Sequence, residues 1–207
     1  MDAGNQTGSF PGSNFFAVSG STTPQSGSST VGAAGGIYYA VSDAFGPGTH
    51  ALLQTFTVSS FSPSVLLTFS MFANSYDGKF VNPIGLDFTD GANQHARVDI
   101  LTAGSSPFDT GAGVLRNLYL GTDAGANPHA YTNYSFDITS TVGAGGTFQL
   151  RFAEVDNQSS LNLGVDDVSI TTAASAVPEP SAFLPIWLIA LIALALKAKL
   201  KHIPREL

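Results

Sequence analysis

The chain has 207 residues, of which eight are Lys or Arg and fifteen are Asp or Glu, giving a formal net charge of −7. Residues 1–176 hold four of the basic and thirteen of the acidic residues, so this body carries a charge of about −9. Such an acidic body excludes nucleic acid and anionic membrane surfaces as partners, because both are bound through clustered Lys and Arg. The absence of Cys excludes disulfides and thiol chemistry.

The first ten residues, MDAGNQTGSF, contain neither a basic stretch nor an apolar stretch. They therefore do not form a secretory signal peptide. If the body is exported, we expect the true start of the protein to lie upstream of Met1. The alternative is a tail-anchored protein whose body stays in the cytoplasm.

Residues 1–36 are predicted to form a flexible N-terminal segment with one short strand at residues 15–18. Thirteen of the eighteen residues from 19 to 36 are Gly, Ser or Thr. This composition is typical of a flexible loop and not of packed structure.

Residues 37–172 contain short runs in which apolar and polar residues alternate, separated by Gly-, Pro- and Asn-rich turns. Alternation of this kind predicts half-buried strands. The predicted strands are residues 37–41, 52–58, 65–73, 84–89, 97–102, 114–120, 134–138, 148–152 and 163–171. Asp90-Gly91 predicts a hairpin that pairs residues 84–89 with 97–102. We therefore predict an all-β antiparallel sandwich, a jelly roll in the first place and an immunoglobulin-like sandwich as the alternative.

Residues 173–207 combine a short motif, an apolar run and a basic tail. The motif is Val177, Pro178, Glu179 and Pro180, and the uncharged run covers residues 182–196. The basic residues that follow are Lys197, Lys199, Lys201 and Arg205. We predict one transmembrane helix over 182–200, since about 20 residues cross a bilayer core when flanking lysines reach the headgroups. The alternative is a buried core helix. The positive-inside rule places the basic tail (197–207) in the cytoplasm and the body outside.

The motif at 177–180, the single apolar helix and the terminal basic cluster together resemble the PEP-CTERM sorting signal. The resemblance implies an exported protein of a Gram-negative bacterium that makes exopolysaccharide. It also implies a membrane peptidase, an exosortase, as the partner that reads Pro178-Glu179-Pro180, and the inner membrane as a transient anchor before the protein reaches the cell surface or the exterior. The alternative is a proline-rich linker with no reader.

The body resembles known proteins more loosely. Its ending GVDDVSI (164–170) is similar to the last strand of galactose-binding-like and carbohydrate-binding jelly rolls. The runs RVDIL, YSFDIT, FQLRFAEVDNQ and GVDDVSI also look like bodies found on other PEP-CTERM proteins.

Residues with catalytic chemistry give no convincing enzyme site. His50, His95 and His129 each stand beside a turn signal or a polar run, and no Gly-x-Ser-x-Gly elbow is present, so we expect exposed histidines. Glu154 and Asp156 alternate onto one strand face, where a glycosidase pair is conceivable but surface charge at a strand end is the simpler interpretation. We therefore predict that the protein is not an enzyme, with a secreted hydrolase as a minor alternative.

The leading interpretation is a non-enzymatic cell-envelope or extracellular-matrix protein sorted by an exosortase-type system. The alternative is a glycan-binding module that acts on exopolysaccharide. The only Trp lies in the apolar run, so tyrosines would have to stack on sugars. The candidates are Tyr38, Tyr39, Tyr76, Tyr119 and Tyr131, whereas Tyr134 is assigned to the core.

Asp166 and Asp167 are adjacent carboxylates on the last predicted strand, so their side chains point to opposite faces. If Val168 and Ile170 face the core, Asp166 faces it too and needs a partner. Two partners remain open. One is a structural Ca²⁺, which the resemblance to carbohydrate-binding jelly rolls implies near this strand, and the other is the backbone N–H groups of a neighbouring loop.

Overall fold

The computed structural model describes residues 2–7, 14–82, 85–89 and 91–173, and the chain divides into two compact units, Met1–Ala174 and Ser175–Leu207. The predicted transmembrane helix (182–200) lies in the second unit, outside the described residues. Among the residues that are described, no helix is long and apolar enough to cross a membrane.

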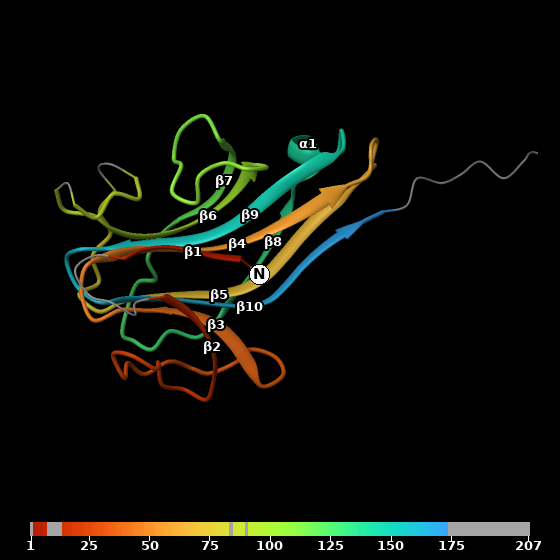
Figure 1. Ribbon diagram of the computed structural model, residues 1–207. Helices are drawn as coiled ribbons and strands as arrows, with labels where there is room; N and C mark the ends of the chain where they lie inside the picture. The colour runs from red at the N-terminus through yellow and green to blue at the C-terminus, as the bar shows by residue number, and fades with distance from the viewer. Residues whose placement is uncertain (1, 8–13, 83–84, 90, 174–207) are drawn as a thin grey trace, which may run out of the picture. The chain divides into compact units, whose positions relative to one another are not determined.

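The body is built from two antiparallel five-stranded sheets (Figure 1). The order of strands in sheet A is β1 (Asp2–Thr7), β4 (Gly48–Val58), β9 (Gly146–Asp156), β6 (Gln94–Thr102) and β7 (Val114–Gly121). The order in sheet B is β2 (Asn14–Ser19), β3 (Tyr38–Asp43), β10 (Leu161–Thr172), β5 (Val65–Ser75) and β8 (Thr132–Asp137). A single turn of helix, α1 (Thr139–Val142), precedes β9. From β3 to β10 the chain crosses to the other sheet at every step except one, since β6 and β7 are neighbours in sheet A; most strands therefore follow one another across the sandwich, as in a jelly roll.

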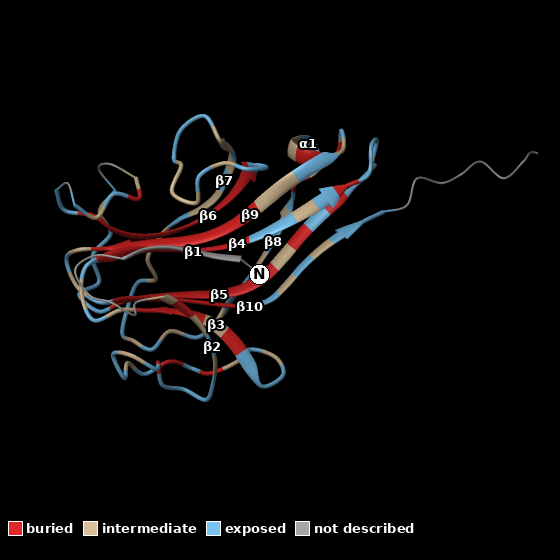
Figure 2. Ribbon diagram, in the orientation of Figure 1, coloured by how far each residue is buried: buried red, intermediate tan, exposed pale blue. Residues whose placement is uncertain are grey.

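The main core lies between the sheets, where alternate apolar residues of each sheet face the other sheet. Alternate residues of β9, such as Leu150 and Phe152, meet alternate residues of β5, such as Leu67 and Phe69. Figure 2 shows the buried stretches of β4, β9, β5 and β10 facing one another, while the end of β10 is exposed. Two antiparallel sheets packed around a shared core confirm the predicted antiparallel sandwich.

The outer face of sheet A is also covered. Leu86 and Phe108, from two loops, pack on Leu53, Leu101 and Val155 of that face.

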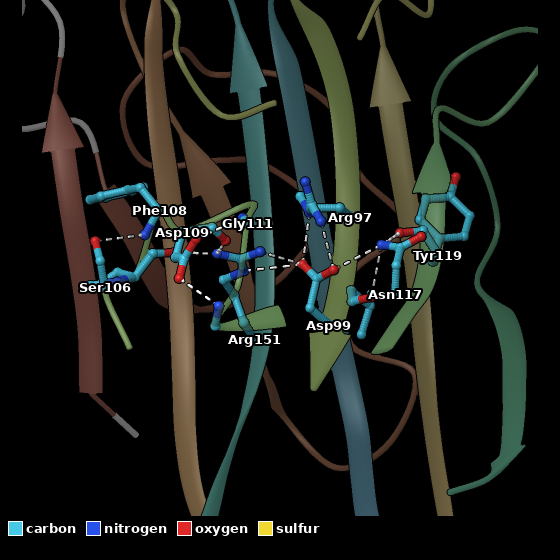
Figure 3. Close-up of polar contacts among 12 residues, drawn as sticks. Arg97, Asp99, Ser106, Phe108, Asp109, Gly111, Asn117, Tyr119 and Arg151 are labelled. Atoms are coloured by element: carbon cyan, nitrogen blue, oxygen red, sulfur yellow. Dashed lines mark hydrogen bonds and ion pairs between the residues drawn. The ribbon is translucent and has the colours of Figure 1, made fainter. Parts of the chain in front are cut away.

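A buried ion network ties residues 103–113 to this outer face (Figure 3). Arg151 donates to the Asp99 carboxylate at 2.6 Å and to the carbonyl oxygens of Pro107 and Asp109 at 2.8 and 2.7 Å. Arg97 donates to the same carboxylate at 2.7 Å. Burial alone raises the pKa of Asp99, but the hydrogen bond from Arg97 and the charge of Arg151 outweigh it, so the pKa lies below its usual value. Asp99 is therefore charged and compensated.

The predicted hairpin between residues 84–89 and 97–102 is wrong. The described residues 85–89 form turns and a loop, and β6 pairs instead with β7 and β9. Asn93 holds the loop by donating its side-chain amide to the carbonyls of Gly85 and Asp87, at 2.7 and 2.8 Å. The apolar residues of this run therefore cover sheet A. A loop that covers a sheet can have the same apolar composition as a strand, so composition alone does not separate the two.

The expectation that residues 19–36 lie outside the packed structure is also wrong. The buried carboxylate of Asp43 accepts hydrogen bonds from the backbone N–H groups of Gln25 and Ser26, at 2.6 and 3.0 Å. Thr30 is buried and shares a hydrogen bond of 2.5 Å with the hydroxyl of Tyr39. Hydrogen bonds to Asp43 and Tyr39 of sheet B thus hold residues 19–36 in place, although this segment has few apolar side chains that could pack.

Candidate functional site

An open groove forms where two neighbouring strands of sheet B separate. β10 pairs with β3 at only two positions, Gly164 opposite Val41 and Val165 opposite Ala40. Beyond Val165 the strand β10 stays with β5, whereas β3 continues alongside β2 and diverges from β10 (Figure 1). The separation coincides with a β-bulge between Asp166 and Ser169. Bulges bend a strand and redirect its side chains, and they are frequent beside functional sites.

The groove has an apolar floor and a rim with one aromatic ring and two carboxylates. Its volume is about 330 Å³. The residues that line it are Ala17, Tyr38, Tyr39, Ala40, Val165, Asp166, Asp167 and Val168. Tyr38 is 64% exposed, which leaves its ring open to a ligand, while Tyr39 is buried. An apolar trough with a few polar groups at its edge is a common form of binding site.

Asp166 is held by the loop that precedes β3. One of its carboxylate oxygens accepts the backbone N–H groups of Ala34 and Gly35, at 2.8 and 3.1 Å. The other oxygen accepts the backbone N–H of Asp167 at 2.8 Å. The predicted inward orientation of Asp166 is wrong: it shares the outer face of sheet B with Gly164, and the bulge shifts the register so that Val168 and Ile170 still pack on the core.

Asp167 carries the free carboxylate of the groove. It is exposed, its backbone lies in the left-handed region (φ 50°), and no hydrogen bond from the described residues reaches its carboxylate oxygens. A non-glycine residue in that region is uncommon and is found at ligand-binding sites. Gly35 permits the arrangement, because a Cβ there would stand 2.7 Å from an Asp167 oxygen.

The pair does not fit a Ca²⁺ site. Calcium takes six to eight oxygen ligands, yet both oxygens of Asp166 already accept N–H groups. Within the described residues there is also no group of three His, Asp or Glu side chains placed to hold a metal. The contacts of Asp166 match the other predicted partner, the backbone N–H groups of a neighbouring loop.

Of the other predicted tyrosines, Tyr131 lies near the groove. It packs with Phe72 and Tyr39 on the outer face of sheet B, and its hydroxyl donates to the carbonyl of Gly32 at 2.9 Å. Burial, and then the charge of Asp166, raises the pKa of Tyr131 above its ordinary value. Tyr76 and Tyr119 line neither this groove nor the second hollow.

The histidines and the acidic pair of β9 lie elsewhere, and most of them are not at the surface. His50 and His95 are fully buried, and Glu154 and Asp156 are buried as well, so the expected exposed histidines and surface carboxylates are wrong at these four positions. The reason is that β4, β6 and β9 are central strands with both faces covered. His129 is half-buried and bonded to Asn74.

The buried pair of β9 forms a polar cluster between the sheets. His50 Nδ1 lies 2.5 Å from a carboxylate oxygen of Glu154, and Asp156 accepts the backbone N–H of Gly48 at 3.0 Å. Burial, and then the charge of Glu154, raises the pKa of Asp156 to about 9. A second hollow, of about 170 Å³, meets only Asp156 of this cluster and is otherwise lined by turn residues 46–47 and 157–160. A glycosidic bond needs both carboxyl groups at its sides, so this arrangement fits a structural cluster better than an acid/base pair.

The residues of the predicted sorting signal lie outside the described residues. These are Val177, Pro178, Glu179, Pro180, Lys197, Lys199, Lys201 and Arg205.

The described body is thus an antiparallel β-sandwich with an open groove at one side of sheet B. No protein-family model matches the sequence, and neither does any curated protein. Solved structures with a similar arrangement include TmCBM61 in complex with β-1,4-galactotriose (TM-score 0.41, 10% identity, covering 68% of this chain and 74% of that one). A CBM4 structure is similar at a TM-score of 0.41 and 15% identity, over 76% of this chain and 78% of the other. The K3 cleaved adhesin domain of Lys-gingipain from Porphyromonas gingivalis w83 is similar at a TM-score of 0.47 and 16% identity, over 81% and 88% of the two chains.

Proposed function

We propose that the β-sandwich body is a non-enzymatic glycan-binding module, and that the groove beside Tyr38 and Asp167 is its binding site. The observation that carries the proposal is the meeting, in one open groove, of an exposed aromatic ring, an apolar floor and a fixed, unpartnered carboxylate. Sugars present C–H groups on the faces of their rings and hydroxyl groups around the edges. The first pack on aromatic rings and the second donate to carboxylates, so the two kinds of group in the groove match a sugar.

The shape of the groove suits a chain polymer. It runs between β3 and β10 where their pairing has ended, so residues of both strands line its two sides. An extended oligosaccharide has hydroxyl groups along both edges and can contact both sides. The ligand that we propose is the exopolysaccharide of the cell that exports the protein.

The first prediction concerns Tyr38. Substitution Tyr38→Ala should weaken binding to purified exopolysaccharide by about tenfold, because an aromatic contact contributes roughly 1–1.5 kcal/mol. Tyr38→Phe should retain most of the affinity, since the ring stays. Isothermal titration calorimetry on the full chain in mild detergent measures the change.

Phe45 supplies the control for this experiment. It is 60% exposed and follows the opposite end of β3, away from the residues of the groove. Phe45→Ala should leave the affinity unchanged. Equal losses in Tyr38→Ala and Phe45→Ala, or no binding by the parent protein, would remove the proposal.

We also propose that the C-terminal residues act as an exosortase-type sorting signal, so that the module is exported, anchored in the inner membrane and then delivered to the surface. This second proposal rests on the succession of Val177-Pro178-Glu179-Pro180, the apolar run and the basic tail. Proline disfavours helix in the residue before it, so an extended motif just outside the bilayer is the form that a peptidase can read.

The second prediction tests this signal. Glu179→Ala should leave the protein uncleaved in the inner membrane, as judged by cell fractionation and by the mass of the protein. Ser181→Ala is a matched control just outside the motif and should not alter processing. A Glu179→Ala protein that reaches the exterior at the same mass as the parent contradicts the sorting proposal.

A further inference from the structure

Among the described residues, no cation compensates the negative charge of the groove. The lining residues include two Asp and no Lys, Arg or His. The described chain contains four Lys and Arg residues, and each is engaged elsewhere. Lys79 pairs with Asp77, Arg97 and Arg151 pair with Asp99, and Arg116 donates to the carbonyl of Asp137. The charge is thus left for a ligand to balance.

The geometry assigns different roles to the two carboxylates. Asp166 accepts three backbone N–H groups, so it fixes the loop and the turn and has little capacity left for a ligand. Asp167 is bound at its backbone N–H, and its carboxylate accepts no hydrogen bond from the part of the chain that is described. Asp166 holds the backbone N–H of Asp167, and Gly35 leaves room beside the Asp167 carboxylate. The backbone of Asp167 is therefore already fixed in its left-handed conformation before a ligand binds. A preorganised group loses less entropy when it binds.

The second contact in the groove also favours a cation. The ring of Tyr38 is open, and a positive charge is attracted to the face of an aromatic ring. An ammonium group can use both a ring face and a carboxylate, whereas a uronic acid or a sulfated sugar is repelled by the carboxylate and finds no basic residue in the lining.

We propose that the groove selects polymers of amino sugars whose nitrogen is not acetylated, with the ammonium group at C2 bound by the carboxylate of Asp167 and the sugar ring packed on Tyr38. This inference rests on the proposed glycan-binding function and specifies its ligand class. It makes Asp167 the residue that determines specificity and Asp166 a positioning residue.

Three β-1,4-linked oligomers test the inference because they differ only at C2: glucose oligomers carry a hydroxyl, N-acetylglucosamine oligomers an amide and glucosamine oligomers an ammonium group. The full chain, in mild detergent at low salt and mildly acidic pH, should bind the glucosamine oligomer at least about tenfold more tightly than the other two. The advantage should shrink with added salt and disappear at alkaline pH, where the amine is neutral.

Asp167→Asn is the decisive variant. It removes the charge while keeping the shape, and Asn also tolerates the left-handed backbone. This variant should bind the glucosamine and glucose oligomers about equally, because its loss of affinity should be about tenfold larger for the glucosamine oligomer, whose ammonium group loses an ion pair, than for the glucose oligomer, whose hydroxyl loses only a charge-assisted hydrogen bond. The control is Asp87→Asn, an exposed carboxylate on the loop that covers sheet A, whose turn Asn can keep. It should behave as the parent.

The possible contradictions are distinct. If the parent binds all three oligomers equally and Tyr38→Ala loses this binding, the amino-sugar inference is overturned, but the proposal that the groove binds glycans stands. A preference for the glucosamine oligomer that Asp167→Asn and Asp87→Asn reduce equally indicates general attraction to the acidic body and overturns it too. Binding of none of the three also overturns it, and the exopolysaccharide titration then decides separately whether the module binds glycans at all.

Discussion

At the scale of single residues, the buried titratable groups are the main departure from what the sequence indicates. His50, His95, Glu154 and Asp156 stand in runs where polar residues alternate with apolar ones, a pattern that normally places the polar residues in water. In the structure all four are buried. The reason is that two loops cover the outer face of sheet A and the other face meets sheet B. The alternation of polar and apolar residues within one strand does not indicate that loops or a second sheet will cover both of its faces.

The first residue-scale prediction concerns pH and Asp156. The raised pKa, about 9, means that the folded protein holds a proton that the unfolded chain, with an ordinary pKa of 3.8, has released. The contribution to stability is therefore complete below the unfolded pKa and is lost as pH rises through the folded one. Between about pH 6 and about pH 8 the free energy of unfolding should fall by about 1.4 kcal/mol per pH unit from this group.

Urea unfolding at several pH values checks this, with Asp156→Asn as the comparison. Asn keeps an acceptor for the N–H of Gly48 but cannot ionise. The variant should lose most of the slope over that range. An unchanged slope would show that Asp156 is ionised in the folded protein.

His95 acts in the opposite pH range. Burial lowers its pKa to about 4, against an ordinary 6.5, although its hydrogen bond to the carbonyl of Val81 opposes the shift. Its contribution is present above pH 6.5 and is lost as pH falls through about 4. Acid and alkaline losses of stability therefore have separate origins in this body.

At the scale of elements, apolar alternation locates strands well, because the same residues that alternate also form the core. The runs at 52–58, 65–73, 97–102 and 148–152 all lie within β4, β5, β6 and β9. The run at 84–89 fails because its apolar residues cover a sheet instead of joining one. The groove could be anticipated only in part: Tyr38 and the two Asp residues were candidates, but the β-bulge that brings them together leaves no signal that alternation can detect.

The prediction at this scale concerns the ion network that fastens residues 103–113. Asp99→Ala should destabilise the protein by about 3–5 kcal/mol, because it leaves Arg97 and Arg151 as buried charges without their shared partner. Thermal or urea unfolding measures the loss. Asp87→Asn, at an exposed position whose turn Asn can keep, should cost about 0.5 kcal/mol or less. A loss for Asp99→Ala as small as that of the control would show that the network contributes little.

At the scale of the whole molecule, the fold and the composition support one description. A sandwich with few charges and no Cys depends on its apolar core, and the acidic surface keeps anionic partners away. One side of sheet B is left open by the divergence of β3 from β10, and the unpaired carboxylate is placed there. The proposed sorting signal complements this description, since a module that binds extracellular polysaccharide has to be exported.

The most direct test of the glycan-binding groove is to map where an exopolysaccharide fragment binds, by following backbone amide signals of the isotope-labelled full chain in detergent during a titration. The account predicts that the shifted signals cluster at Ala17, at residues 38–40 and at residues 165–168, the lining of the groove. Shifts that cluster instead on the loops covering sheet A, at residues 85–89 and 103–113, would contradict it, as would a titration in which no signal moves.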